Sequence, residues 1–129
     1  MKNLQTATAV IELSAGLALL ACPSTTAAFL VGMPLESPAA LSVARVGAAG
    51  LLALGVACWL ARCDTQSLAA RGLVTAMLLY NIAAAAVLAF AGIGFGMHSV
   101  ALWPAVILHA GMTVWCIASL LGKTSPLEP

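Results

Sequence analysis

The sequence contains very few charged and aromatic residues. Only 7% of its 129 residues are Asp, Glu, Lys or Arg, and 5% are Phe, Trp or Tyr, whereas about 25% of the residues of a soluble domain are charged. So few charged side chains cannot keep the surface of a soluble domain of this size solvated. A net charge of +1 is also too small to suggest nucleic acid as a partner. The composition therefore excludes a soluble domain and predicts no nucleic-acid partner.

What the sequence has in abundance is apolar residues, which make up 63% of the chain. They form continuous blocks rather than the alternating pattern of a membrane β-barrel. Four blocks reach the roughly 20 residues that a helix needs to cross the hydrocarbon layer. We therefore expect an all-α fold, an antiparallel bundle of four transmembrane helices, with residues 1–129 forming a single integral membrane domain. The expected spans are residues 4–22, 41–61, 72–92 and 100–121.

The apolar stretch after the first span, residues 24–33, is too short to cross a membrane. Pro23 and Pro34 bracket it, and Ser24, Thr25 and Thr26 offer candidate N-caps at its start. It is either a short helix in the membrane interface or the continuation of the first span beyond a kink at Pro23. We favour the short interfacial helix.

The basic residues are distributed asymmetrically between the two faces of the predicted bundle. Lys2, Arg62, Arg71 and Lys123 all fall on the face that carries both termini, and the opposite connections contain no Lys or Arg. The positive-inside rule then predicts that both termini are cytoplasmic. Residues 2–22 also resemble a lipoprotein signal ending at Cys22, but Glu12 lies in what would be its uncharged core, which argues against that alternative.

The four cysteines do not have the spacing of a metal or redox site. Cys58 and Cys63 form a C-x4-C pair, while Cys22 and Cys116 are isolated. In the predicted topology only Cys22 would meet an oxidising compartment, and it has no partner there. We expect the cysteines to be small apolar fillers in packed helices and predict no metal site.

Each predicted span contributes a strongly polar side chain, and this distribution carries the functional information. The residues are Glu12 in the first span, Arg45 in the second, Tyr80 and Asn81 in the third and His109 in the fourth. An ionisable group at the bilayer centre costs about 2.5 to 3.5 kcal/mol, so it faces a partner, a cavity or water. Counting the helical rise places Glu12, Asn81 and His109 in one layer near mid-membrane. Arg45 lies nearer the other face, and we expect its long side chain to reach towards Glu12 and hold it ionised.

Three interpretations of this polar cluster remain open from the residues alone. It is a hydrogen-bonded network that fixes packing, a ligand or proton site, or a contact with a partner subunit. Tyr80 and His109 together are suited to bracket the head group of a quinone, whose carbonyls need hydrogen-bond donors in an apolar surrounding. The sequence contains no nucleophile and base pair and no paired carboxylates. These absences favour a non-enzymatic role without deciding it, and the sequence does not indicate a cofactor.

Several short motifs resemble a known group of membrane proteins. Glu12 followed by Gly16, then Arg45-Val46-Gly47, Tyr80-Asn81 and Trp103-Pro104 with His109 resemble the pattern of small bacterial four-helix membrane proteins that are loosely DoxX-like. The resemblance covers nearly the whole chain. It implies a location in the bacterial inner membrane and a link to quinone-dependent or thiol redox systems, without assigning catalytic residues.

These observations lead to three functional hypotheses. The first is a non-enzymatic binding or accessory protein that holds a hydrophobic ligand with a polar head, a quinone or a lipid, at the polar cluster. The second is a proton-coupled small-molecule transporter that acts as a dimer through Glu12. The third is a structural subunit of a larger membrane complex. An ion pair between Glu12 and Arg45 would argue against the second hypothesis, because a transporter needs Glu12 to exchange protons.

Overall fold

The computed structural model describes residues 1–64 and 67–122, and these residues form five helices without a strand. Four of the helices are long and apolar enough to cross a membrane. The chain is therefore a multi-pass helical membrane protein, and the expected all-α bundle with a short helix after the first span is confirmed. Lys123, which contributes to the predicted orientation, lies outside the described residues. The helices are α1 (Lys2–Ala21), α2 (Pro23–Val31), α3 (Pro38–Ala61), α4 (Leu68–Gly94) and α5 (Leu102–Leu121).

The first span ends before the short helix begins. Cys22 leaves the helical conformation, with φ −131° and ψ 64°, and Pro23 occupies the first turn of α2, where its missing N–H costs nothing. The short helix is thus separate from the first span, as favoured from the sequence. It begins one residue earlier than expected, and the Ser24 hydroxyl donates to the carbonyl of Leu35 instead of capping the helix.

Two serine caps make α3 and α4 longer than the apolar blocks alone predict. The hydroxyl of Ser37 accepts from the N–H of Ala40, and that of Ser67 accepts from the N–H of Ala70. These bonds satisfy N–H groups that have no partner within the first turn of a helix. The two helices therefore begin at residues 38 and 68, ahead of the predicted starts at 41 and 72.

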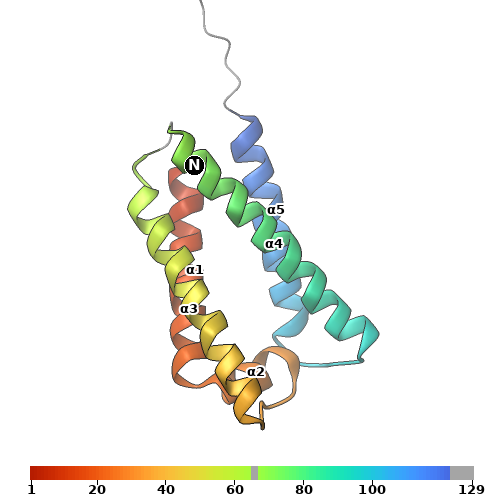
Figure 1. Cartoon of the computed structure of the whole chain (residues 1–129). Coiled ribbons are helices and arrows are strands. Elements are labelled where there is room, and N and C mark those ends of the chain that lie inside the picture. The colour runs from red at the N-terminus through yellow and green to blue at the C-terminus, as the bar shows by residue number, and fades with distance from the viewer. Residues whose placement is uncertain (65–66, 123–129) are drawn as a thin grey trace, which may run out of the picture.

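The bundle is built from two helix pairs. α1 packs along α3, and α4 packs along α5, while α3 and α4 meet only briefly. Figure 1 shows the pairs side by side, closer together at the end where the N-terminus lies, with α2 at the opposite end. Consecutive long helices run antiparallel, so Lys2, Arg62 and Arg71 lie at one end of the bundle.

The pair formed by α1 and α3 is closely packed because small residues line its interface. A Cβ atom on Gly55 would lie 2.8 Å from Leu13 Cγ and 3.1 Å from the Leu13 backbone nitrogen. Gly16 similarly faces the carbonyl of Ala48. Small residues allow this approach in a membrane, where no hydrophobic effect drives helices together. These contacts also fix the register, since they set Leu13 level with Gly55 and Gly16 level with Ala48.

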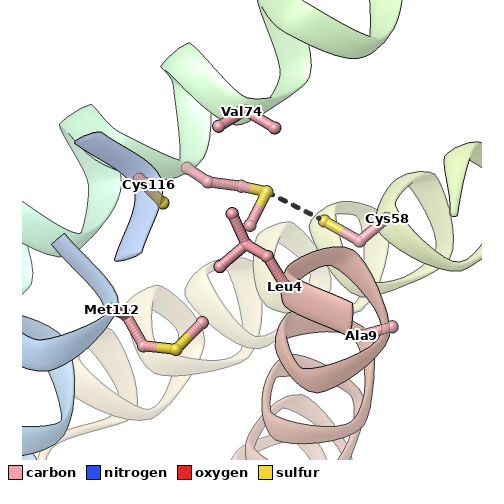
Figure 2. Packing of buried hydrophobic residues seen from close by; sticks show 7 residues of the cluster. Leu4, Ala9, Cys58, Val74, Met112 and Cys116 are labelled. Atoms are coloured by element: carbon pink, nitrogen blue, oxygen red, sulfur yellow. Dashed lines mark hydrogen bonds between the residues drawn. The ribbon is translucent and has the colours of Figure 1, made fainter. Parts of the chain in front are cut away.

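The helix pairs meet in an apolar core at the end of the bundle that carries the N-terminus. Its members come from the N-terminal halves of α1 and α4 and from the C-terminal halves of α3 and α5, and Figure 2 shows Leu4 with Cys58, Val74, Met112 and Cys116 around it. The Cys58 thiol donates to the Met77 sulfur at 3.5 Å. The core residues are Leu4, Ala9, Cys58, Val74, Met77, Met112 and Cys116.

At the opposite end, α2 is tied to the connection between α4 and α5. The Ser99 hydroxyl donates to the Leu30 carbonyl at 2.7 Å. Gly32 ends α2 with φ 84°, in the left-handed region that favours glycine, and a Cβ atom there would collide with the carbonyl of His98. The two helix pairs are therefore joined at both ends of the bundle.

Candidate functional site

Three of the predicted polar residues lie at the middle of their helices. Glu12 is the eleventh of the 20 residues of α1, Asn81 the fourteenth of the 27 residues of α4, and His109 the eighth of the 20 residues of α5. Because all three helices run the length of the bundle, their middle residues lie in one layer. We refer to Glu12, Tyr80, Asn81 and His109 as the polar layer.

Asn81 and His109 join α4 to α5 by a hydrogen bond. His109 Nδ1 lies 2.8 Å from Asn81 Oδ1, and the Asn81 amide nitrogen donates to the Met77 carbonyl at 2.8 Å. This second bond fixes the orientation of the Asn81 amide, so Oδ1 is the acceptor and His109 Nδ1 carries the proton. In the neutral imidazole the other ring nitrogen, Nε2, then presents an unprotonated lone pair. The structure contains no hydrogen bond from Nε2 to another described residue.

Tyr80 connects this pair to Glu12 on the other side of the bundle. Its ring packs edge-on against the His109 ring, with the ring centroids 5.7 Å apart and the planes at 83°. The Tyr80 side chain also lies near the Glu12 carboxyl. Edge-to-face packing orients both rings. The polar layer thus runs from α1 through α4 to α5, across the boundary between the two helix pairs.

Glu12 is the most buried ionisable group of the layer, with 3% of its surface exposed. Besides Tyr80, its electrostatic neighbours include the Cys58 thiol of α3. Neither is a cation, and no described residue forms an ion pair with Glu12. A carboxyl group in this position is free to change its protonation state without breaking a salt bridge.

Arg45 does not reach Glu12, contrary to expectation. The packing of Gly16 against Ala48 places Arg45 level with the C-terminal end of α1, about 10 to 15 Å along the helix axis from Glu12. Its side chain is exposed on the surface of α3. A long Arg side chain near the end of a span can extend along the helix to the interface, which removes the need for a buried partner. Arg45 is thus separate from the polar layer.

Two further polar residues lie on the buried face of α1, and the sequence analysis did not identify them as a site. Gln5 is fully buried and Thr8 is 1% exposed. Gln5 Nε2, Gln5 Oε1 and Thr8 Oγ1 have no hydrogen-bond partner among the described residues. Gln5 and Thr8 precede Glu12 by seven and four residues, which places all three on the same helix face. This spacing could have identified them from the sequence.

Two of the four cysteines, Cys58 and Cys116, pack as fillers inside helices, whereas Cys22 and Cys63 lie outside the helices. All four are free, with Cys58 and Cys116 buried and Cys22 and Cys63 exposed. Within the described residues, no group of three or more His, Cys, Asp or Glu side chains is arranged to hold a metal ion.

The polar layer offers complementary hydrogen-bonding groups in an otherwise apolar surrounding. His109 Nε2 accepts, Tyr80 donates or accepts, and Glu12 accepts when ionised and donates when protonated. Among the described residues, no Ser, Thr or Cys side chain is hydrogen-bonded to the imidazole of His109 or to the carboxyl of Glu12; the Thr113 hydroxyl donates to the backbone carbonyl of His109. This arrangement is suited to binding a polar group and to exchanging a proton. Comparison of the chain with protein-family models, curated proteins and solved structures gives no match.

Proposed function

We propose that the protein is a non-enzymatic binding or accessory protein that holds a hydrophobic molecule with a polar head, a quinone or a lipid, at the polar layer. The observation that carries this proposal is the position of Tyr80 and His109. Both are only partly buried, although they lie at mid-membrane depth and carry polar groups. In the membrane, the exposed surface of Tyr80 and His109 is covered either by lipid acyl chains or by a ligand that is soluble in the bilayer.

The hydrogen-bonding groups of His109 and Tyr80 limit which head groups the polar layer can bind. The Nε2 lone pair of His109 accepts from a hydroxyl group, and the Tyr80 hydroxyl donates to a carbonyl. A quinol and its quinone carry these two groups in their two redox states, and a lipid with a free hydroxyl or an ester carries them together. Because the helix pairs meet at the two ends of the bundle, such a molecule would enter sideways from the bilayer.

The cellular setting of the proposal comes from the sequence. The DoxX-like motifs support the bacterial inner membrane and a quinone-linked role. Lys2, Arg62 and Arg71 lie at one end of the bundle, and the positive-inside rule then favours cytoplasmic termini. A homodimer or a larger membrane complex is compatible with these features.

Histidine NMR tests the proposal directly. The chain has two histidines, His98 in the connection after α4 and His109 in the polar layer, so labelling histidine with 15N gives two sets of signals. Delipidated protein in nanodiscs is titrated with a quinol, a quinone, a hydroxyl-bearing lipid or buffer. We expect the Nε2 signal of His109 to shift with at least one of the three ligands, while His98 stays constant. No shift of His109 with any of them would refute ligand binding at this layer.

A second candidate function is proton-coupled transport through Glu12. The observation that favours it is the absence of an ion pair at Glu12 among the described residues, since an alternating carboxyl group must be able to gain and lose a proton. Glu12→Gln separates the two functions. It should leave ligand binding at His109 detectable if the protein is a binding protein. It should abolish proton-coupled uptake into proteoliposomes if the protein is a transporter.

A further inference from the structure

The face of α1 that leads from the N-terminal end of the bundle to the polar layer carries three buried polar side chains. Gln5 is 0% exposed, Thr8 1% and Glu12 3%. The Gln5 amide and the Thr8 hydroxyl lack partners among the described residues. Buried polar groups are almost always hydrogen-bonded, to protein or to ordered water. Two adjacent exceptions on one helix face therefore indicate a bound polar species.

The spacing of the three residues fits water. Gln5 and Thr8 are three residues apart and Thr8 and Glu12 four, which corresponds to rises of about 4.5 and 6 Å. A single water that accepts from one group and donates to another spans about 5 to 6 Å between them, because each hydrogen bond is about 2.8 Å long. A buried water typically makes about three hydrogen bonds. The amide and the hydroxyl supply both donors and acceptors for such waters.

The polar face stops at Glu12. Between Glu12 and the end of α1 at Ala21, the one polar side chain is Ser14, which is exposed and donates to the Ile11 carbonyl. Gly16, the next buried residue on this face, packs against α3. The buried polar side chains of α1 therefore extend from near its N-terminal end to the middle of the helix and no further.

We propose that Gln5 and Thr8 bind a file of water molecules that conducts protons between Glu12 and the membrane face where α1 begins. A hydronium ion at that face gives a proton to the first water, each water breaks one O–H bond as it forms another, and the last water transfers a proton that forms an O–H bond at the Glu12 carboxylate. The reverse transfer returns it to the same face. Glu12 thereby exchanges protons with one compartment only, whether or not the polar layer binds a quinone or a lipid.

The groups around Glu12 are consistent with its being the end point of this path. The titratable side chains near it are Tyr80 from α4 and Cys58 from α3, with Cys116 and His109 of α5 adjacent to these two. Glu12 is the one carboxylate located within the five helices, since Glu36 and Asp64 lie in connections. Glu12 is therefore the one carboxyl group of the five helices at which the path can end.

Water-edited solid-state NMR of the ligand-free wild-type protein in bilayers tests whether the waters are present. Magnetisation from water should reach the side chains of Gln5 and Thr8 several times faster than those of Leu4 and Ala9, which lie in the apolar core on the same turns of α1. Equal, slow build-up at all four residues would overturn the proposal. The measurement requires no substitution and no ligand, so its result is independent of the histidine titration.

Carbodiimide labelling tests proton exchange. Dicyclohexylcarbodiimide reacts with protonated carboxyl groups in membranes, so in oriented vesicles the modification of Glu12 should follow the pH on the side where α1 begins. The double variant Gln5→Leu and Thr8→Val should slow the response to a pH jump at least tenfold. Thr6→Val is the matched control, because the Thr6 hydroxyl donates to the Lys2 carbonyl of its own helix, and it should respond like the wild type. A response that follows the opposite side, or a double variant as fast as the wild type, would overturn the proposal.

Discussion

The hydrogen bond between Asn81 and His109 is the best-defined contact of the polar layer, and a double-mutant cycle measures its strength. Asn81→Leu and His109→Phe remove the two partners while keeping side chains of similar volume. Each single change leaves the other partner without its hydrogen bond in a partly buried site, which typically costs about 1 to 3 kcal/mol of unfolding free energy. The Met77 carbonyl also loses the amide of Asn81 but retains the backbone bond of the helix.

The coupling between the two changes isolates the bond itself. Hydrogen bonds between membrane helices measured in this way average about 0.6 kcal/mol and reach about 1.7 kcal/mol. The 2.8 Å separation and the locked Asn81 amide place this bond in the upper half of that range. We therefore expect the double variant to be about 1 to 1.7 kcal/mol more stable than the sum of the single losses predicts.

The assay is reversible unfolding in bilayer discs by steric trapping, with the free energy read for the wild type, both single variants and the double variant. The control cycle pairs Asn81→Leu with Thr75→Val, because the Thr75 hydroxyl donates to the Arg71 carbonyl and does not contact Asn81. Distant sites add within about 0.5 kcal/mol. If the Asn81 and His109 cycle is as additive as the control, the two side chains do not form the bond and the assigned tautomer loses its basis.

Three other predictions concern packing and topology. Gly32→Ala should lower the unfolding free energy by at least about 1 to 2 kcal/mol, because Gly32 has a left-handed backbone and no room for a Cβ atom; thermal unfolding in detergent measures this, and an unchanged midpoint would contradict it. Gly55→Ala should cost about 1 to 3 kcal/mol by overpacking the contact between α1 and α3, whereas Gly47→Ala, with no atom within 4 Å of the added Cβ, should not destabilise the protein. In whole cells an impermeant maleimide should label a cysteine substituted for Glu36 but not native Cys63 before permeabilisation, and the reverse pattern would invert the proposed orientation.

The architecture follows from features that are local in the sequence. An apolar block of about 20 residues has to form a helix in a membrane, because no water is available there for its backbone groups. Pro23 at the end of the first block separates α1 from α2 for an equally local reason. The starts of α3 and α4 were predicted less well, since a capping serine such as Ser37 lies outside the apolar block that it caps.

The polar layer was predicted only in part, because depth follows from counting residues while neighbours follow from packing. Counting placed Glu12 and His109 at the same level. Whether Arg45 could reach Glu12 depended on the register between α1 and α3. The glycine contacts set this register, and the sequence alone did not give it. The burial of Gln5 depends on how α1 packs in the bundle, and a polar residue one turn into a span is normally solvated at the interface. The sequence therefore did not predict the contacts between helices that are far apart along the chain.

Native mass spectrometry of the gently solubilised protein tests the central claim, that the polar layer binds an amphiphilic molecule, most directly. The wild type should retain a molecule with the mass of a quinone or a lipid, and the same spectrum reports the number of copies of the chain. His109→Ala should lose most of this bound mass, whereas His98→Ala, altered in the connection outside the layer, should retain it. A wild-type spectrum without bound mass, or a His109→Ala spectrum identical to that of the wild type, would contradict the account.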